Sequence, residues 1–461
     1  MTFYLLLELQ GKENRSYKIN HQHPVINIPT FIQPVKTNTM NVKRRDFINL
    51  SLLTASGVII SSCSTREKEG SDKATALASM TKDVVPITVE ERKARIVKAQ
   101  RLMTEQNIQA LILDSGTSLR YFTGISWWPS ERPMVAIIPA KGETSYVCPG
   151  FEESRLRELI KIGKDVYPWQ EDESPYAQII HALKESGIQS GSIAMEERLR
   201  FFIVDGIRKE APQYNYVSGT PITMPCRIIK SAAEIALMQK ATDITVAAIK
   251  HGISQLKEGM TQDELDGIIS RAHDQLGGNG GGGLILFAES SAIPHGSTKP
   301  RSLKKGDVVL MDCGCTVEGY ASDITRTVVF GNAPTKRQQD IWNLEQQSQL
   351  AGFNAAKIGA ACEAVDAACR EIITNGGFGP DYKLPGLPHR TGHGIGMDGH
   401  EWGNMVKGNT QLLQAGMCFS IEPTIAIPGE FGIRLEDCIY MTDEGPKSFA
   451  PFAKSISEPF G

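Results

Sequence analysis

The chain has 461 residues, of which 41% are hydrophobic and 22% are charged, a balance typical of globular proteins with two or three domains. Its 49 basic and 52 acidic residues nearly cancel, which gives no electrostatic basis for binding nucleic acid.

The amino-terminal part contains the features of an export signal. From Met40 it reads MNVKRRDFINLSLLTASGVIISSCS: a basic stretch with the pair Arg44-Arg45, an apolar stretch too short to span a bilayer, and small residues before Cys63. The arginine pair resembles a twin-arginine signal. Residues 60–63 resemble a bacterial lipobox, which would make Cys63 the lipidated first residue of the mature protein; the alternative is plain cleavage with a free Cys63.

We therefore expect residues 40–63 to be a signal peptide and residues 64–83 to be a polar linker. Residues 1–39 precede a complete signal that has its own Met, so we expect a mis-assigned start codon and disorder there. These features predict an exported bacterial protein, either periplasmic or anchored to the membrane only through a lipidated Cys63.

Residues 84–228 alternate between helical and extended patterns and predict an α/β domain. The first helix is expected to follow Thr88, with Glu91 completing a capping box. Apolar strands follow, including ALILD at 110–114 and MVAIIP at 134–139. The domain contains neither GxGxxG nor GxxxxGK[ST], so nothing in it supports nucleotide binding.

Residues 229–461 predict an α+β domain. Capping boxes at Ser231 and Thr261 open two helices, and two more helices are expected from about 335 to 356 and from 362 to 375. The run GGNGGGG at 277–283 lacks the Lys-Ser/Thr pair of a phosphate-binding loop, and we expect it to be a flexible loop.

A weak internal repeat runs through this second domain. KEGMTQDELDGIISRAHDQLGG, from Lys257, resembles KIGAACEAVDAACREIITNGG, from Lys357. Each copy precedes strand-rich sequence, so we expect two related halves forming a pseudo-symmetric domain with a site between them.

The stretch 307–331, DVVLMDCGCTVEGYASDITRTVVFG, predicts a β-hairpin that turns at Glu318-Gly319. Its register makes Asp312 and Asp323 diagonal neighbours on one face, with Cα atoms ~7–8 Å apart, and Gly314 is expected to leave the space between them open. Two carboxylates directed at one buried spot repel each other, and a cation removes that penalty. The alternative is one Asp on the sheet rim and the other capping a turn.

The same register places Thr325 on the carboxylate face and Cys313 and Cys315 on the opposite face, which suits packing. The cysteines that follow Cys63 lack paired CxxC spacing, so a zinc ribbon is not indicated.

Further candidate ligands follow the second repeat copy. The segment HRTGHGIGMDGHEWG carries three histidines, and the predicted strands MCFSIEPTIAI and FGIRLEDCIYM each carry a glutamate in apolar surroundings. A lone histidine is more often structural, and a lone strand glutamate is usually solvated, but buried carboxylates need partners. Two Asp, one or more His and two Glu form an oxygen-rich set suited to two divalent ions about 3.5–4 Å apart.

These segments, in this order, resemble the "pita-bread" metallopeptidases of family M24, which include methionine aminopeptidase, prolidase and aminopeptidase P. The matching motifs are MDCGCTVEGYASDITRTV, HRTGHGIGMDGHE, FSIEP and GIRLEDCIYMTDEG, and the resemblance covers about residues 84–461. The upstream domain, with LRYFTG, resembles the creatinase/prolidase N-terminal domain, which methionine aminopeptidases lack. The implied fold is that α/β domain (84–228) followed by a pseudo-symmetric α+β pita-bread catalytic domain (229–461).

The resemblance also implies roles for single residues. Asp312 would hold one metal ion and His393 with Glu422 the other, while Asp323 and Glu436 would bridge both. Glu422 would also carry the proton of the attacking water.

Four further residues would surround the substrate. The three histidines His295, His389 and His400 would steady the substrate carbonyl and the developing tetrahedral charge. Arg434 would engage substrate or support the ligands.

The implied enzyme is a dinuclear-metal exopeptidase that uses a metal-bridging hydroxide to cleave the Xaa–Pro bond of dipeptides or at the N-terminus of longer peptides. Manganese is the expected metal, with cobalt or zinc as alternatives, and a homodimer is expected. The competing readings are a metal-free creatinase-like C–N hydrolase, a metal-using lyase of a small sulfonium compound, and a non-catalytic peptide-binding protein. Retention of all five ligand positions argues against the metal-free and non-catalytic readings.

Overall fold

The computed structural model describes residues 77–299 and 301–461. The predicted upstream segment, the signal peptide with Cys63 and most of the linker lie outside the described residues. Within the described part of the chain, no helix is both long and apolar enough to cross a membrane.

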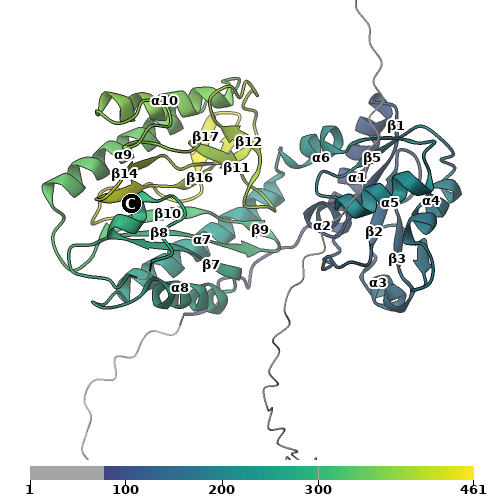
Figure 1. The fold of residues 1–461 in the computed structure, drawn as a ribbon, viewed down its shortest axis with the longest axis horizontal. Coiled ribbons are helices and arrows are strands. Elements are labelled where there is room, and N and C mark those ends of the chain that lie inside the picture. Colours follow the sequence, from purple (N-terminus) through teal and green to yellow (C-terminus); the bar gives the residue numbers. More distant parts are fainter. Residues whose placement is uncertain (1–76, 300) are drawn as a thin grey trace, which may run out of the picture. The chain divides into compact units, whose positions relative to one another are not determined.

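The first domain is a six-stranded mixed sheet in the order β4-β3-β2-β1-β5-β6 (Figure 1). Its strands are β1 (Ile108–Asp114), β2 (Val135–Pro139), β3 (Ser145–Pro149), β4 (Val166–Trp169), β5 (Ser192–Met195) and β6 (Asn215–Ser218). Its helices are α1 (Val89–Glu105), α2 (Thr117–Thr123), α3 (Glu153–Leu159), α4 (Pro175–Glu185), α5 (Phe201–Glu210) and α6 (Thr220–Arg227).

Both faces of this sheet are covered, which explains the continuous apolar pattern of its central strand. Leu111 and Leu113 of β1 pack in a core cluster with α1 residues such as Met103, whereas Ile112 packs in a second cluster with α4 residues such as Ile179. Alternate side chains of one strand thus enter two cores.

The capping box predicted for α1 is only half correct. Thr88 accepts a hydrogen bond from the Glu91 amide, but the Glu91 carboxylate accepts from Arg95 (2.9 Å) and from Ser231 (2.8 Å) instead of returning to Thr88. The Glu91 side chain therefore binds the charged Arg95 instead of completing the predicted cap, because a hydrogen bond between charged groups is stronger.

The second domain places four helices around strands of three sheets. The helices are α7 (Ala232–Ser254), α8 (Gln262–Leu276), α9 (Lys336–Ala355) and α10 (Cys362–Asn375). The sheets are β10-β8-β7 with β9 on β8, then β12-β11-β13-β16-β17, and the pair β14-β15. The strands are β7 (Asn279–Phe287), β8 (Val308–Val317), β9 (Tyr320–Ala321), β10 (Ile324–Val329), β11 (Gly392–Gly394), β12 (Glu401–Met405), β13 (Cys418–Ile421), β14 (Thr424–Ile427), β15 (Phe431–Arg434), β16 (Asp437–Thr442) and β17 (Gly445–Ser448).

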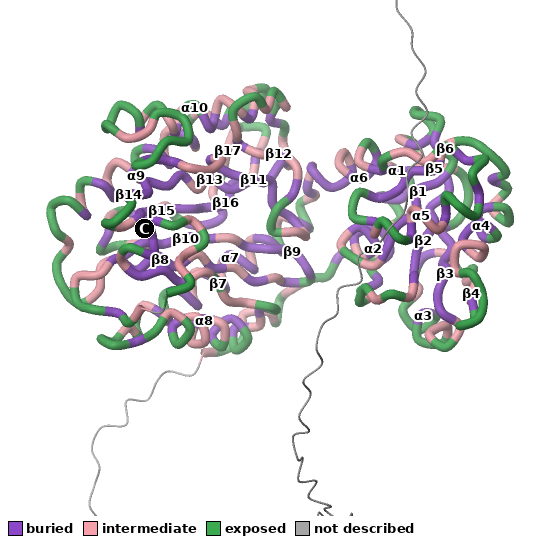
Figure 2. Tube along the Cα trace, in the orientation of Figure 1, coloured by how far each residue is buried: buried purple, intermediate pink, exposed green. Residues whose placement is uncertain are grey.

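The predicted two-half arrangement is present in this domain. Gly259 donates to Leu303 and Gly359 donates to Leu413 at equivalent positions before α8 and α10. In Figure 1, α8 lies on one side of the strands and α9 with α10 on the other, and Figure 2 shows the strands between them mostly buried.

Two equivalent aspartates support the same repeat. Asp266 of α8 accepts from the backbone amide of Gly283, and Asp366 of α10 accepts from that of Thr391. Each half therefore ties its helix to the backbone of its own sheet through the same carboxylate.

The predicted hairpin register is confirmed: Val317 pairs with Tyr320 and Asp312 pairs with Thr325. The expected opening at Gly314 is wrong, because a Cβ there would lie 2.3 Å from the Ser322 carbonyl oxygen. Glycine at this position lets the backbone that carries Asp323 approach the strand that carries Asp312.

The glycine-rich run is not a loop. Strand β7 begins at Asn279, and Gly283 pairs with Cys313 of β8. A Cβ on Gly283 would lie 2.1 Å from the Asp312 carbonyl oxygen. Two backbones that approach this closely need glycine, a reason that the sequence pattern does not reveal.

Each of the two predicted C-terminal strands is broken. MCFSIEPTIAI forms β13 and β14 with a break at Glu422-Pro423, and FGIRLEDCIYM forms β15 and β16 with a break at Leu435-Glu436. On either side of the breaks the chain pairs in different sheets, β13 with β16 and β14 with β15. Both glutamates therefore lie where the chain passes from one sheet to another. The interrupted strand pairing leaves room there for side chains to converge.

A buried carboxylate at the start of β12 fastens the junction between α6 and α7. Glu401 accepts from Arg227 (2.5 Å) and Lys230 (2.9 Å), and all three side chains are at most 2% exposed. Burial by itself would raise the pKa of Glu401, but the cations of Lys230 and Arg227 outweigh it and lower the pKa from 4.5 to about 2.

The lowered pKa of Glu401 predicts that the protein becomes less stable in acid. Between pH 4.5 and pH 2 the unfolded chain binds a proton that the folded chain refuses, so the free energy of unfolding should fall by about 3 kcal/mol as the pH drops through this window. Denaturant unfolding of wild type and Glu401→Gln at several pH values checks this. Glu401→Gln should lose that part of the pH dependence, whereas Glu430→Gln, at an exposed carboxylate, should keep it; equal slopes in all three proteins would contradict the prediction.

Candidate metal centre

One cavity of about 400 Å³ is lined by all nine residues that the sequence predicted for the catalytic and metal site. It is lined by Pro294, His295, Asp312, Asp323, His389, Arg390, His393, His400, Glu422, Arg434 and Glu436. The nine predicted side chains thus lie together, although their individual roles stay predictions. Pro294 and Arg390 were not predicted.

The hairpin contributes two carboxylates from neighbouring strands. Asp312 extends from β8, and Asp323 lies between β9 and β10, with side chains 25% and 22% exposed. The Asp323 carboxylate lies 3.8 Å from Nε2 of His393, a candidate ligand in the other half of the domain.

His393 presents one ring nitrogen to the carboxylates. Its Nδ1 lies 3.1 Å from the Gly394 carbonyl oxygen, which fixes the tautomer with Nδ1 as donor. Nε2 then faces Glu422 Oε1 at 3.3 Å and Glu436 Oε1 at 4.0 Å. Burial, followed by neighbouring His400, lowers the pKa of His393 to about 3, so the ring is neutral and its Nε2 lone pair is available to a cation.

Glu436 supplies the clearest sign of a missing partner. Its Oε2 accepts from Thr325 Oγ1 at 2.7 Å, whereas its buried Oε1 has no hydrogen-bond partner among the described residues. Ligand atoms of Asp323, His393 and Glu436 all lie within 4.8 Å of one another. A buried, unpaired carboxylate oxygen beside an aspartate and a free imidazole nitrogen fits a divalent cation.

The electrostatics of the cavity agree with that fit. Burial, followed by the neighbouring carboxylates, raises the pKa of both Asp323 and Glu436 well above the usual range. Burial raises the pKa of Glu422 to about 7 even though Arg434 opposes the shift. Bound cations would relieve this crowding of carboxylates, as in other carboxylate-rich sites.

Arg434 and Thr325 position the candidate ligands. Arg434 at the end of β15 donates to Asp312 Oδ2 (2.5 Å) and to Thr325 Oγ1 (3.2 Å). Thr325 also exchanges backbone hydrogen bonds with Glu436. The hairpin register placed Thr325 on the carboxylate face but gave it no role, because the sequence did not show that Glu436 pairs with it.

The other three histidines of the cavity differ in exposure and in whether their ring nitrogens are already hydrogen-bonded. His295 and His400 are exposed at the cavity, and the His400 ring centroid lies 4.1 Å from that of His393. His389 is occupied on both nitrogens, by the Arg390 carbonyl oxygen (2.7 Å) and by Thr424 Oγ1 (3.0 Å). In this geometry His295 and His400 are the better placed to contact a substrate.

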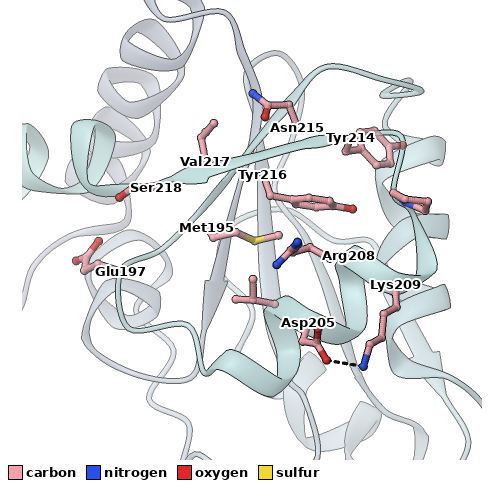
Figure 3. Close-up of a pocket in the computed structure, with 12 residues that line it drawn as sticks. Met195, Glu197, Asp205, Arg208, Lys209, Tyr214, Asn215, Tyr216, Val217 and Ser218 are labelled. Carbon is pink, nitrogen blue, oxygen red and sulfur yellow. Dashed lines mark ion pairs between the residues drawn. The ribbon is translucent and has the colours of Figure 1, made fainter. Parts of the chain in front are cut away.

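A larger hollow, of about 700 Å³, lies on the first domain along β6 and α5 (Figure 3). Its charged residues include Asp205 and Lys209, which form an ion pair with each other at 2.7 Å. No group of candidate metal ligands was found there among the described residues.

Comparisons with known proteins agree with this geometry. Residues 236–443 match the model of metallopeptidase family M24, and residues 95–229 match the creatinase/prolidase N-terminal domain. An uncharacterized peptidase of Schizosaccharomyces pombe is 34% identical over 391 residues, which cover 79% of this chain and 82% of that protein. The chain belongs to the M24 metallopeptidase family.

Solved structures of M24 peptidases share the fold. The prolidase from Thermococcus sibiricus superposes with a TM-score of 0.71 at 28% identity, covering 78% of this chain and 96% of its own. The Xaa-Pro dipeptidase from Bacillus anthracis gives 0.69 at 26% identity, covering 78% and 97%. The protein is thus a metal-dependent M24 peptidase with a creatinase-type N-terminal domain, and the family implies divalent metal ions at the carboxylate cluster.

Proposed function

We propose that this M24 peptidase hydrolyses the Xaa–Pro bond of dipeptides. The observation that carries the proposal is the convergence of Asp323, His393 and the unpaired Glu436 Oε1 in one cavity. The prolidase and Xaa-Pro dipeptidase structures, which match nearly the whole of their own chains, support this choice of substrate. Proline lacks the N–H that ordinary peptidases bind, so a dedicated site is expected for its peptide bonds.

The residues of the site would have different roles. Asp312, Asp323, His393, Glu422 and Glu436 would hold the divalent ions. When bound, the ions supply Lewis-acid polarisation of the substrate carbonyl and activation of a water molecule. Arg434 would keep Asp312 in place.

The chain's own groups then carry protons and stabilise charge. Glu422 would accept the proton of the attacking water and pass it to the proline nitrogen as the C–N bond breaks, so the products are a carboxylic acid and a secondary amine. His295 and His400 would donate hydrogen bonds to the oxygen that gains charge.

A hydrolysis assay tests this proposal. We expect the purified protein to cleave Gly-Pro faster than Ala-Pro-Pro, to lose activity with a chelator and to regain it with Mn²⁺, Co²⁺ or Zn²⁺. Gly-Leu serves as the control substrate without proline. If correctly folded protein cleaves no Xaa-Pro peptide with any metal, the proposal fails and C–N bond chemistry on a small molecule becomes the better reading.

We also propose that the enzyme is exported, on the basis of the leader described from the sequence. Arg44→Lys with Arg45→Lys should leave a larger precursor inside the cell. Cys63→Ser should abolish labelling by a radioactive fatty acid. Cell fractionation and labelling check both, and normal processing of the double-lysine variant would contradict export through the twin-arginine route.

A further inference from the structure

A chain of buried side-chain hydrogen bonds runs behind the hairpin that carries Asp323. Nε2 of His273, on α8, lies 3.1 Å from Oγ1 of Thr245, on α7, and Oγ1 of Thr245 lies 2.8 Å from Oγ of Ser322. His273 and Thr245 are fully buried, and Ser322 is 5% exposed. Ser322 directly precedes Asp323, so the chain ends one residue from a candidate metal ligand.

The histidine fixes the direction of every hydrogen bond in this chain. Nδ1 of His273 lies 3.0 Å from the carbonyl oxygen of Ile269 and must donate to it. Burial lowers the pKa of His273, so the ring is neutral and Nε2 can only accept. Thr245 therefore donates to Nε2, and Ser322 donates to Thr245. The Ser322 hydroxyl oxygen is then free to accept from the backbone amide of Cys315 at 3.1 Å.

The Ser322 hydroxyl takes the place of a backbone carbonyl where the strand pairing of the hairpin is interrupted. Strand β9 ends at Ala321 and β10 begins at Ile324, so Ser322 and Asp323 lie between the two strands. The Ser322 amide donates to the Cys315 carbonyl oxygen at 3.0 Å, while its hydroxyl accepts from the Cys315 amide. Both backbone groups of Cys315 thus hold Ser322, and the backbone that directs Asp323 into the cavity is fixed.

Packing alone does not require a histidine at this position. Ile373 stands one hundred positions after His273, at the equivalent place in the second repeat copy, and is buried. In the first half, Gly281 of β7 passes so close to His273 that a Cβ there would overlap its side chain. An apolar residue fills the position in one half, whereas the half that carries Asp323 makes room for a polar one.

We propose that Thr245 and His273 are positioning residues of the metal centre, which act through Ser322 to hold Asp323 in the direction that lets its carboxylate bind a cation. The proposal rests on the proposed role of Asp323 as a metal ligand and not on the peptide that is cleaved. Loss of a residue that supports a ligand from behind typically costs about 10- to 100-fold in metal affinity or activity, because ligands tolerate only small displacements.

Two substitutions of Thr245 test the proposal. Thr245→Val keeps the shape of the side chain and removes the hydroxyl, so Ser322 can turn its hydrogen to the Cys315 carbonyl oxygen, 3.2 Å away. Calorimetric titration of the metal-free, full-length protein with Mn²⁺ should show a dissociation constant raised about 10- to 100-fold. At saturating Mn²⁺, kcat for Gly-Pro should fall more than KM changes. Thr245→Ser keeps the hydroxyl and should restore both quantities to within about threefold.

Two substitutions of His273 test the far end of the chain. His273→Leu removes the acceptor and should weaken Mn²⁺ binding in the same direction as Thr245→Val, but by less, because Thr245 can still bind Ser322. His273→Gln offers an amide oxygen to Thr245 and should bind Mn²⁺ more tightly than His273→Leu.

The visible absorption of Co²⁺-loaded protein reports the ligand geometry without catalysis. The band of the wild-type protein should shift or lose intensity in Thr245→Val and return in Thr245→Ser. Thr123→Val is the matched control, because it removes an equally buried hydroxyl that donates to the Leu119 carbonyl oxygen (2.7 Å) in the first domain. It should lower the free energy of unfolding by a similar amount and leave Mn²⁺ affinity and the Co²⁺ band unchanged.

The outcomes separate this proposal from the proposed function. Unchanged Mn²⁺ affinity and an unchanged Co²⁺ band in folded Thr245→Val would overturn the positioning role, and so would equal losses in Thr245→Val and Thr245→Ser. A wild-type protein that binds Mn²⁺ but cleaves no Xaa-Pro peptide would contradict the proposed function alone, since the metal affinities of the variants still decide the role of Thr245 and His273.

Discussion

Asp323→Asn is expected to lower kcat/KM for Gly-Pro by about 1,000-fold or more, equivalent to about 4 kcal/mol of transition-state stabilisation. The substitution keeps the size of the side chain but removes its negative charge. The Asp323 carboxylate lies 3.8 Å from His393 Nε2. Metal content of the dialysed protein should fall with activity, as measured by elemental analysis.

The same variant should fold normally. Burial, followed by Asp312 and Glu422, raises the pKa of Asp323, so in chelator its replacement by a neutral amide relieves repulsion, and the melting temperature should not fall. Asp340→Asn, at an exposed helical site, is the matched control and should keep both metal and rate. Full metal content together with an undiminished rate in Asp323→Asn would exclude Asp323 as a ligand.

Arg326→Met is expected to cost about 3–5 kcal/mol of unfolding free energy, the largest stability effect we predict. Arg326 and Asp437 form a 2.7 Å ion pair with side chains 0% and 1% exposed. The guanidinium also donates to the carbonyl oxygens of Thr325 (3.0 Å) and Glu436 (2.8 Å). Its loss leaves a buried carboxylate whose remaining partner among the described residues is Gln349, and it frees the backbone at Glu436, a candidate metal ligand.

Denaturant unfolding measures this effect, and a double-mutant cycle separates its parts. Asp437→Asn in the Arg326→Met background should restore part of the loss, because it removes the unpaired charge. Arg337→Met breaks an exposed pair with Glu430 and should change stability by less than about 1 kcal/mol. A cost for Arg326→Met as small as that of Arg337→Met would contradict the assignment.

The sequence predicted those parts of the site that depend on local chain geometry. The register of the hairpin around Glu318-Gly319 follows from a two-residue turn and from side-chain alternation, so the diagonal placement of Asp312 and Asp323 needed no tertiary information. The repeat also predicted two related halves. Motif order added His393, Glu422 and Glu436, although not their distances.

Several features depended on contacts between distant segments and were missed or wrong. The glycine-rich run at 277–283 was predicted as a loop because composition alone suggests flexibility, whereas most of it belongs to β7, and Gly283 allows β7 to approach β8. The breaks at Glu422-Pro423 and Leu435-Glu436 were missed because each glutamate lies within a segment whose pattern otherwise predicts one continuous strand.

The amino-acid sequence by itself determined the hairpin register, because turn chemistry and side-chain alternation act over short stretches of chain, and the resemblance of its motifs to a known family indicated the family, the two-domain order and the candidate ligands. Tertiary structure decided which atoms lack partners. Thr325 binds one oxygen of Glu436 and leaves the other without a partner among the described residues, and Arg434 is paired with Asp312. Whether a buried charge is paired depends on strands far apart in the sequence, so the sequence alone does not reveal it.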